Sequence, residues 1–91
     1  MGAVAAAIER KIRSALQPAS LIITDDSAKH AGHAGAREGG ESHFTVEIVS
    51  SAFEGKSRVA RQRMVYALLK EEIAQGLHAL ALVTKTPAET N

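Results

Sequence analysis

The sequence predicts an α+β domain in which helices cover one face of a three-stranded mixed sheet. Apolar residues recur every three or four positions in two segments, as in amphipathic helices, and alternate with polar residues in a third, as in a strand. Of the 91 residues, 45% are hydrophobic but only 3% are aromatic, so aliphatic side chains must build the core. We expect the order αββαβ, or αββααβ if the second helical segment is divided.

The first helix and the first strand lie on either side of a proline. Apolar residues recur at steps of four in the N-terminal segment: Val4, Ile8, Ile12 and Leu16. This spacing places them on one face of a helix. Pro18 cannot continue that helix, and the apolar run at 21–23, which is rich in β-branched residues, predicts that a strand follows.

A long polar segment, residues 25–42, separates the first strand from the second. It contains four glycines and has no apolar periodicity, which is typical of a flexible surface loop. Loops well beyond a dozen residues are uncommon in compact domains and are often functional or disordered. Because this loop carries His30 and His33, we interpret it as a candidate functional segment.

The second strand and the second helix follow this loop. Apolar and polar residues alternate over 43–49, which predicts a half-buried strand paired antiparallel with the first. We expect Gly55 to adopt a positive φ in the next turn and Ser57 to cap the helix. Phe53 and Tyr66 are interpreted as packing residues. The apolar face of the helix carries Val65, Leu68, Leu69 and Ile73.

The C-terminal part of the chain predicts one more strand. We expect the helical segment to be divided near Glu71 and Glu72 and to end at Gly76. Alternation over 77–85 then predicts the third strand, whereas the polar tail from Pro87 is expected to fray. Strands joined through a helical crossover normally run parallel, so strands two and three should run the same way.

This topology brings three strand termini to one end of the sheet: the end of strand one and the starts of strands two and three. His43 and His78 begin strands two and three, and the loop with His30 and His33 leaves from the same place. All four histidines are therefore expected to gather there. We interpret His43 as structural rather than functional.

Composition excludes several classes of function. The chain has no cysteine, so it supplies no thiolate to a metal or cluster and forms no disulfide. A net charge of +1 is too small to attract nucleic acid to the whole molecule, and no apolar run of about 18 residues predicts a membrane helix. The sequence shows no nucleophile with a paired base, no phosphate loop after a strand and no carboxylate pair in a motif, so no pattern indicates an enzyme.

The length predicts a single domain over residues 1–91, with its core at about 5–87. The N-terminal residues lack the basic region of a secretory signal, so the cytoplasm is the default location. A mitochondrial or chloroplast location is the alternative if a transit peptide has been removed.

Short motifs occur in several elements of this order. They are Phe53-x-Gly55-x-Ser57, Arg61-x-Arg63-x-Val65-Tyr66, Gly76-Leu77-His78-Ala79-Leu80, Asp25-Asp26-Ser27 followed by His30, and Glu41-Ser42-His43-Phe44. Together they resemble the signature of the BolA-like family over most of the chain. Gln62 departs from it, since the family commonly has histidine between the two arginines.

The resemblance implies a fold like that of a type II KH domain and a role in iron homeostasis and iron-sulfur cluster handling. It implies a monothiol glutaredoxin as partner, whose cysteine, with glutathione, supplies thiolates to a shared [2Fe-2S] cluster. We expect a monomer that holds no cofactor when alone and forms a heterodimer with this partner.

The resemblance also implies the ligands from this chain, which are His78 and one loop histidine. His30 and His33 fit the second position equally well. The alternative for the loop histidines is an exposed side chain without a role, and for His78 a strand side chain bonded to the backbone.

Nucleic-acid binding and transcriptional regulation form the alternative function. Basic residues that contact DNA phosphates or a partner would come from one helical stripe: Lys56, Arg58, Arg61 and Arg63, with Lys70. A solvated helix face is the simpler explanation of the same pattern. No GXXG loop interrupts a helix, and few aromatic residues are present to stack on bases.

Overall fold

The computed structural model describes residues 2–26, 43–77 and 79–90. The elements are α1 (Ala3–Leu16), β1 (Ser20–Asp25), β2 (His43–Val49), the 3-10 helix η2 (Ser51–Phe53), α2 (Arg58–Leu68), α3 (Lys70–Ala74), β3 (Ala79–Lys85) and the 3-10 helix η3 (Pro87–Thr90). This order confirms the αββααβ form of the prediction. Within the described ranges, no helix combines the length and the apolar character needed to cross a membrane.

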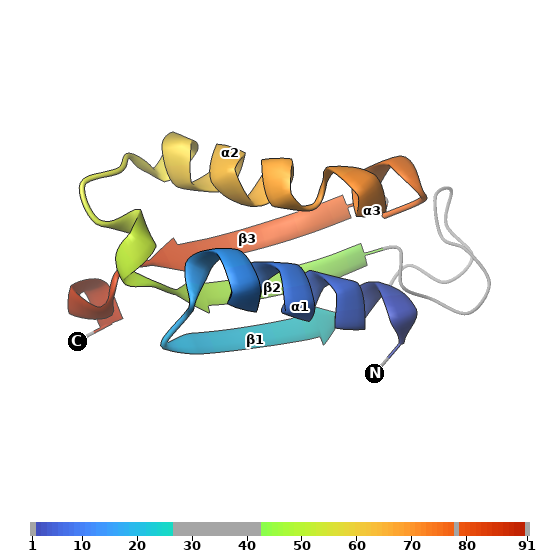
Figure 1. Cartoon of the computed structure of the whole chain (residues 1–91), viewed down its shortest axis with the longest axis horizontal. Coiled ribbons are helices and arrows are strands. Elements are labelled where there is room, and N and C mark those ends of the chain that lie inside the picture. The colour runs from blue at the N-terminus through green and yellow to red at the C-terminus, as the bar shows by residue number, and fades with distance from the viewer. Residues whose placement is uncertain (1, 27–42, 78, 91) are drawn as a thin grey trace.

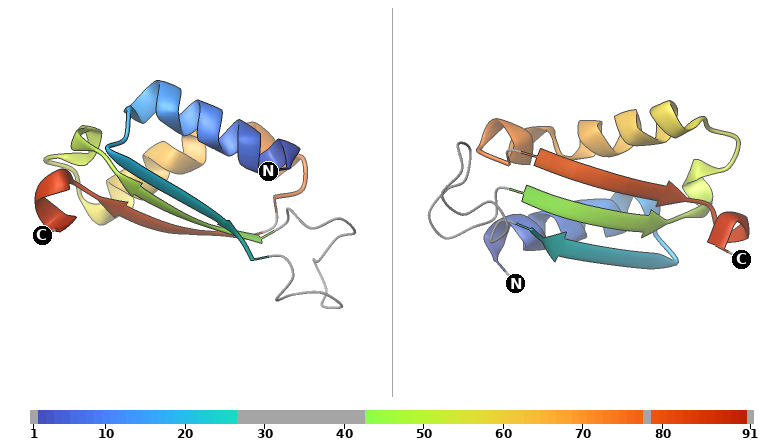
Figure 2. Two further views of the ribbon diagram at one scale, coloured as in Figure 1. Left: turned by 90° about the horizontal axis from the view of Figure 1, so that it is seen from below. Right: turned by 180° about the vertical axis from the view of Figure 1, so that it is seen from behind.

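β2 is the central strand of a three-stranded mixed sheet with the order β1-β2-β3 (Figure 1). β1 pairs with it antiparallel and β3 pairs with it parallel, which confirms both predicted pairings. Helices α1 and α2 lie over the same face of the sheet, and the opposite face carries no helix of the described chain (Figure 2). The molecule therefore has two layers.

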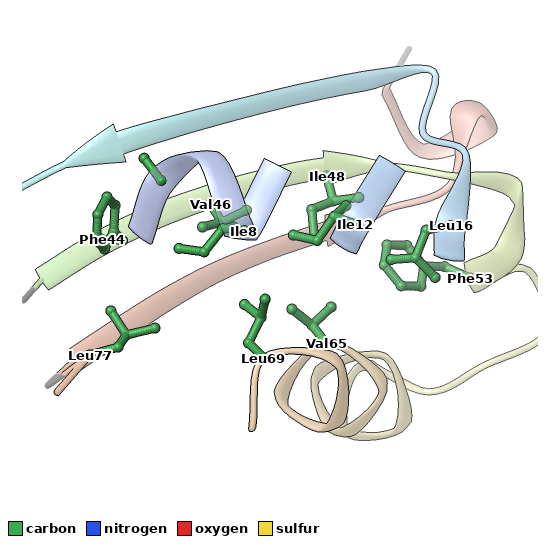
Figure 3. Close-up of a cluster of buried hydrophobic side chains, with 11 residues drawn as sticks. Ile8, Ile12, Leu16, Phe44, Val46, Ile48, Phe53, Val65, Leu69 and Leu77 are labelled. Atoms are coloured by element: carbon green, nitrogen blue, oxygen red, sulfur yellow. The ribbon is translucent and has the colours of Figure 1, made fainter. Parts of the chain in front are cut away.

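The core lies between the helices and the sheet. The four-residue spacing predicted for α1 is realised, since that helix buries Ile8, Ile12 and Leu16. They pack against the inward-facing residues of β2 and of α2 (Figure 3). The buried core consists of Ala5, Ile8, Ile12, Leu16, Phe44, Val46, Ile48, Phe53, Val65, Leu69 and Leu77.

The turn that leads into α2 is built as the sequence predicts. Gly55 has a φ of 75°, which a residue with a side chain adopts only at a cost. The hydroxyl oxygen of Ser57 accepts a hydrogen bond from the backbone N–H of Ala60 at 3.1 Å. That bond satisfies one of the unpaired donors at the start of the helix.

The second helical segment differs from the prediction in two respects. It is divided at Leu69, whose φ of −103° departs from helical geometry, rather than near Glu71 and Glu72. Ile73, expected on the apolar face, is 38% exposed, whereas Glu72 is only 8% exposed. The division turns α3 so that Glu72 meets Lys11 of α1, with Nζ lying 2.9 Å from the Glu72 Oε2.

The expectations for Tyr66 and for the C-terminal tail also require correction. Phe53 is fully buried, as predicted, but Tyr66 is 42% exposed and its hydroxyl donates to the Leu80 carbonyl at 3.2 Å. The tail forms η3 instead of fraying. Its order results from contacts of Glu89 with Arg61 and with the backbone of Thr86.

Candidate functional site

One end of the sheet collects the termini of all three strands. Asp25, the last residue of β1, lies opposite Phe44, and His43 lies opposite Ala79, the first residue of β3. This confirms the predicted meeting of the strand termini. His30, His33 and His78 lie outside the described residues, so their gathering at this end remains a prediction.

The described part of this end contains a recess beside His43. His43 is 8% exposed, and its carbonyl oxygen accepts from the Asp26 N–H at 2.7 Å. The Thr45 hydroxyl donates to the Asp26 carboxylate at 2.5 Å. A recess of about 240 Å³ is lined by Asp26, His43, Phe44, Ala79, Leu80 and Ala81. An imidazole and a carboxylate thus lie next to the position where β3 begins.

The turn before β3 is held by packing and by an ion pair. Leu77 is buried, and its N–H donates to the Glu72 carbonyl at 3.0 Å. Glu72 and Glu71 in turn accept from Lys11 at 3.0 and 3.3 Å. The hydrogen bond that Lys11 donates to the Glu72 carboxylate raises the pKa of Lys11 above its usual 10.5. The residue that precedes His78 in the chain is therefore fixed to the core.

The side chains of this chain offer imidazole and carboxylate donors to a metal but no thiolate. Among residues 2–26, 43–77 and 79–90, no three His, Cys, Asp or Glu side chains form a group that could hold a metal ion. The chain contains four histidines and no cysteine. Imidazoles can replace two thiolates on one iron, as in Rieske centres, so the remaining thiolates would have to come from another molecule.

A second polar region lies where β3 ends and α2 begins. A groove of about 620 Å³, here called the basic groove, is lined by Lys56, Arg58, Arg61, Val83, Thr84, Lys85 and Glu89. The structure thus brings together three of the five basic residues predicted to contact DNA or a partner, and adds Lys85. Arg63 and Lys70 do not line the groove.

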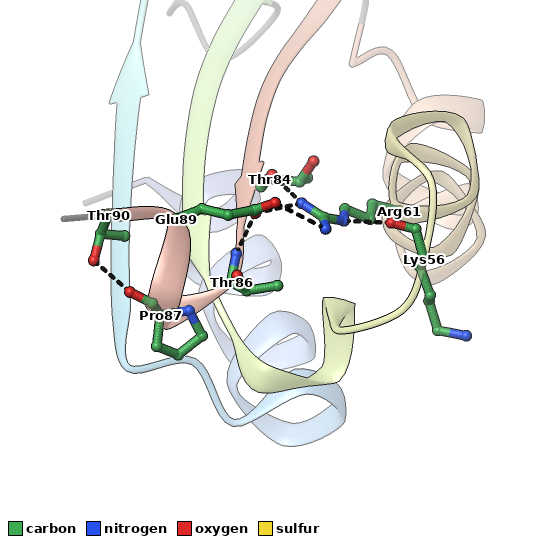
Figure 4. Close-up of polar contacts among 7 residues, drawn as sticks. All are labelled: Lys56, Arg61, Thr84, Thr86, Pro87, Glu89 and Thr90. Atoms are coloured by element: carbon green, nitrogen blue, oxygen red, sulfur yellow. Dashed lines mark hydrogen bonds and ion pairs between the residues drawn. The ribbon is translucent and has the colours of Figure 1, made fainter.

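All three side-chain nitrogen atoms of Arg61 donate hydrogen bonds within the chain (Figure 4). Its Nε donates to the Lys56 carbonyl at 3.0 Å, and its Nη1 donates to the Thr84 carbonyl at 3.1 Å. Nη1 and Nη2 donate to the two carboxylate oxygens of Glu89 at 2.7 and 3.2 Å. The guanidinium carbon also lies 5.9 Å from the centroid of the Phe53 ring. Arg61 therefore has a structural role, whatever else contacts the groove.

Glu89 completes this cluster from the tail of the chain. The Arg61 guanidinium, followed by the backbone N–H of Thr86, lowers the pKa of the Glu89 carboxyl from 4.5 to about 2. That N–H donates to the carboxylate at 2.8 Å. The carboxylate is therefore charged over the whole physiological range.

The sequence alone did not predict the ion pairs of Glu89 and Glu72. Their partners lie 28 and 61 positions away, respectively, at Arg61 and Lys11. No local pattern indicates either pair. An acidic residue in a polar tail is ordinarily solvated, and a glutamate beside an apolar stripe ordinarily faces water.

The comparisons with known proteins agree on one family. The family described as "BolA-like protein" matches residues 12–89. Over 88 residues the chain is 50% identical to "Protein BOLA1, chloroplastic" of Arabidopsis thaliana, which covers 94% of this chain and 55% of that protein. Over 86 residues it is 50% identical to "SufE-like protein 1, chloroplastic/mitochondrial" of the same plant, covering 90% of this chain and 23% of that protein. The chain thus spans about half of one relative and a quarter of the other.

A solved structure shows the same fold. The "BolA domain of SufE1 from Arabidopsis thaliana" superposes with a TM-score of 0.89 at 47% sequence identity, covering 98% of each chain. This agreement extends over the three-stranded mixed sheet and the helices that cover it. Because the family match, the sequence identity and the fold all coincide over nearly the whole chain, this chain belongs to the BolA-like family.

Proposed function

We propose that this chain is a non-catalytic partner of a monothiol glutaredoxin and contributes two imidazole ligands to a shared [2Fe-2S] cluster. His78 is the proposed ligand at the start of β3, and His30 or His33 is the proposed second ligand. In this role the chain would act in iron-sulfur cluster assembly, cluster trafficking or iron homeostasis. The observation that carries this proposal is the meeting of three strand termini at one end of the sheet.

The geometry of that end supports the proposal in two ways. The loop sequence must leave the sheet after Asp26 and return at His43, which pairs with the residue that follows His78. The position before His78 is fixed, because Leu77 is buried and bonded to α3. A ligand that follows a fixed position loses little conformational entropy on binding.

The chemistry of the donors also supports a shared cluster. Each imidazole must be neutral to bind iron, so the chain supplies no charge of its own to the cluster. The partner and glutathione supply the thiolates that this chain lacks. A cluster held in this way forms only in the complex, which is why we propose a heterodimer and an isolated chain without a cofactor.

The family members lend further support. A domain that matches this chain forms part of a relative named SufE-like protein 1, which supports a link to iron-sulfur metabolism. The names of two relatives include the chloroplast, and one also includes the mitochondrion. These names favour the organellar alternative for this chain, whereas the cytoplasmic location remains a prediction.

Reconstitution tests the proposal directly. The protein is combined with a monothiol glutaredoxin, glutathione, iron and sulfide, and the visible CD spectrum is recorded. We expect wild type to convert the spectrum of the glutaredoxin cluster into a new one, His78→Ala to abolish the new spectrum, and one of His30→Ala and His33→Ala to do the same. The other loop variant should behave as wild type.

A cysteine variant separates ligation from structure. His78→Cys restores a metal ligand but not an imidazole, so we expect a cluster spectrum that returns in a shifted form. Far-UV CD and thermal unfolding of each variant report whether the fold is intact. A wild-type protein that leaves the glutaredoxin spectrum unchanged would refute the proposal. So would three histidine variants that all reproduce the wild-type spectrum.

A further inference from the structure

The basic groove lies at the opposite end of the sheet from the strand termini near the histidine positions. β3 begins at Ala79, next to His43, and ends at Lys85, which lines the groove. The N-terminus of α2 lies at the same end (Figure 1), and Lys56 and Arg58 flank its N-cap. A ligand in the groove would therefore leave the other end of the sheet accessible.

Charge in this groove is far from balanced. Its lining contains four cationic side chains and one carboxylate, a net charge of +3, although the whole chain carries only +1. The remainder of the chain therefore carries −2. The single carboxylate is bound by Arg61. Lys56, Arg58 and Lys85 form no ion pair with a carboxylate of the described chain.

Glu89 shows which chemical group the groove accommodates. Both of its oxygens are bound by the Arg61 guanidinium, and one also accepts from the Thr86 N–H. The Arg61 side chain is only 12% exposed, whereas the Glu89 side chain is 47% exposed. A carboxylate from the chain itself thus occupies part of the groove beside Arg61, and Lys56, Arg58 and Lys85 remain exposed.

We propose that the basic groove binds an acidic peptide segment of a partner protein. Its carboxylates would pair with Lys56, Arg58 and Lys85, beside the internal pair of Arg61 and Glu89. The exposed Val83 offers an apolar surface for the aliphatic stems of glutamate side chains. This inference does not depend on the proposed cluster.

The lining favours a peptide over a nucleic acid. Single-stranded nucleic acids bind through aromatic side chains that stack on bases, and no residue of the groove is aromatic. Phe53 is buried beneath Arg61, and the Tyr66 hydroxyl is bonded to β3. Arg61, which would be the strongest phosphate ligand, already holds a carboxylate.

Peptide titration of the protein alone tests this proposal. The probe is acetylated and amidated hexaglutamate, with hexaglutamine as the neutral comparison, at a salt concentration of about 0.15 M. Binding is followed through the amide NMR shifts of uniformly labelled protein. We expect hexaglutamate, and not hexaglutamine, to shift the amides around Lys56, Arg58 and Lys85.

Charge-matched variants locate the binding site. The groove variant is Lys56→Glu/Arg58→Glu/Lys85→Glu, and the control is Arg10→Glu/Arg63→Glu/Lys70→Glu, whose exposed residues lie outside the groove. Each lowers the net charge by six. We expect the groove variant to bind hexaglutamate at least about tenfold more weakly and the control to change affinity by less than about threefold. Glu89→Gln should bind at least as tightly as wild type, because it removes a competing carboxylate.

Three outcomes would overturn the proposal. The first is wild-type protein that shows no difference between hexaglutamate and hexaglutamine. The second is an equal loss in the groove and control variants, which would indicate non-specific attraction. The third is a short DNA duplex that binds the groove more tightly than the peptide and displaces it, which would make nucleic acid the ligand.

Discussion

The guanidinium of Arg61 holds both carboxylate oxygens of Glu89, a residue 28 positions further along the chain. The same side chain donates to the carbonyl oxygens of Lys56 and Thr84. It thereby links the turn before α2, the end of β3 and η3. Bidentate pairs of arginine and carboxylate fix geometry as well as contributing energy, so this contact explains why the tail is ordered.

Loss of Arg61 should destabilise the fold more than loss of other arginines in α2. Arg61→Ala leaves the carbonyls of Lys56 and Thr84 without their donor, and we expect the free energy of unfolding to fall by about 2–3 kcal/mol. Arg63→Ala, an exposed change two positions away, should cost less than about 0.5 kcal/mol. Urea unfolding of both variants provides the measurement. Equal losses would contradict the structural role of Arg61.

The Glu89 contact should make stability depend on pH in the acid range. The carboxyl has a pKa of about 2 in the folded chain and 4.5 as its ordinary value, so the folded state favours its charged form. The stabilisation is therefore fully present above pH 4.5 and is lost as the pH falls from 4.5 towards 2. We expect Glu89→Gln to unfold earlier than wild type at neutral pH. The difference between the two should shrink through that window in thermal unfolding scans.

Two apolar residues that the sequence places on one helix face should respond differently to truncation. Leu69→Ala removes a fully buried side chain, and we expect a loss of about 2–5 kcal/mol in unfolding free energy. Ile73→Ala, at a site that is 38% exposed, should cost clearly less, at about 1 kcal/mol. Denaturant titration compares them. A larger loss for Ile73→Ala than for Leu69→Ala would contradict the finding that Leu69, and not Ile73, packs in the core.

Substitution of Gly55 should measure the energetic cost of its positive φ separately from any steric clash. A Cβ at this position would meet no heavy atom within 4 Å, so only the φ of 75° opposes a side chain. We expect Gly55→Ala to destabilise the protein by about 1–2 kcal/mol and Gly55→Asn by less, since asparagine tolerates this region better. If both variants match wild type in thermal unfolding, the turn must change its conformation.

The proposed cluster should be sensitive to acid. Imidazole loses its ability to bind metal when it is protonated, near an ordinary pKa of about 6.5. We expect the visible CD of the heterodimer to fade as the pH falls through this range, whereas the all-thiolate glutaredoxin cluster should persist to lower pH. A heterodimer spectrum that stays unchanged well below this range would argue against histidine ligation.

Local sequence patterns predicted the parts of the fold that depend on local interactions. The four-residue spacing predicted α1, alternation predicted β2, and the turn residues Gly55 and Ser57 adopt the expected conformation and cap. Each of these features follows from neighbours within a few positions. The strand termini at one end of the sheet follow in turn from the antiparallel pairing of β1 with β2 and from the parallel direction of strands joined by a helical crossover.

Distant partners explain what the patterns could not predict. The tail was expected to fray because its own composition is polar, and its ordering contact comes from α2. Glu72 is buried because Lys11 of α1 reaches it, which also turns Ile73 outwards. In the candidate site, the meeting of the three strand termini is confirmed, whereas His30, His33 and His78 as ligands stay predictions.

The ion pair of Lys11 with Glu72 joins residues 61 positions apart, and β2 pairs in parallel with the last strand of the chain. During synthesis, α1 leaves the ribosome long before the carboxylate that holds it and before β3 exists. Contacts of such long sequence separation form late and slowly. The apolar face of the first helix can pack on β2 earlier, but its contacts with Val65 and Leu69 and its ion pair with Glu72 have to wait for the C-terminal third of the chain, and until then part of this face is exposed.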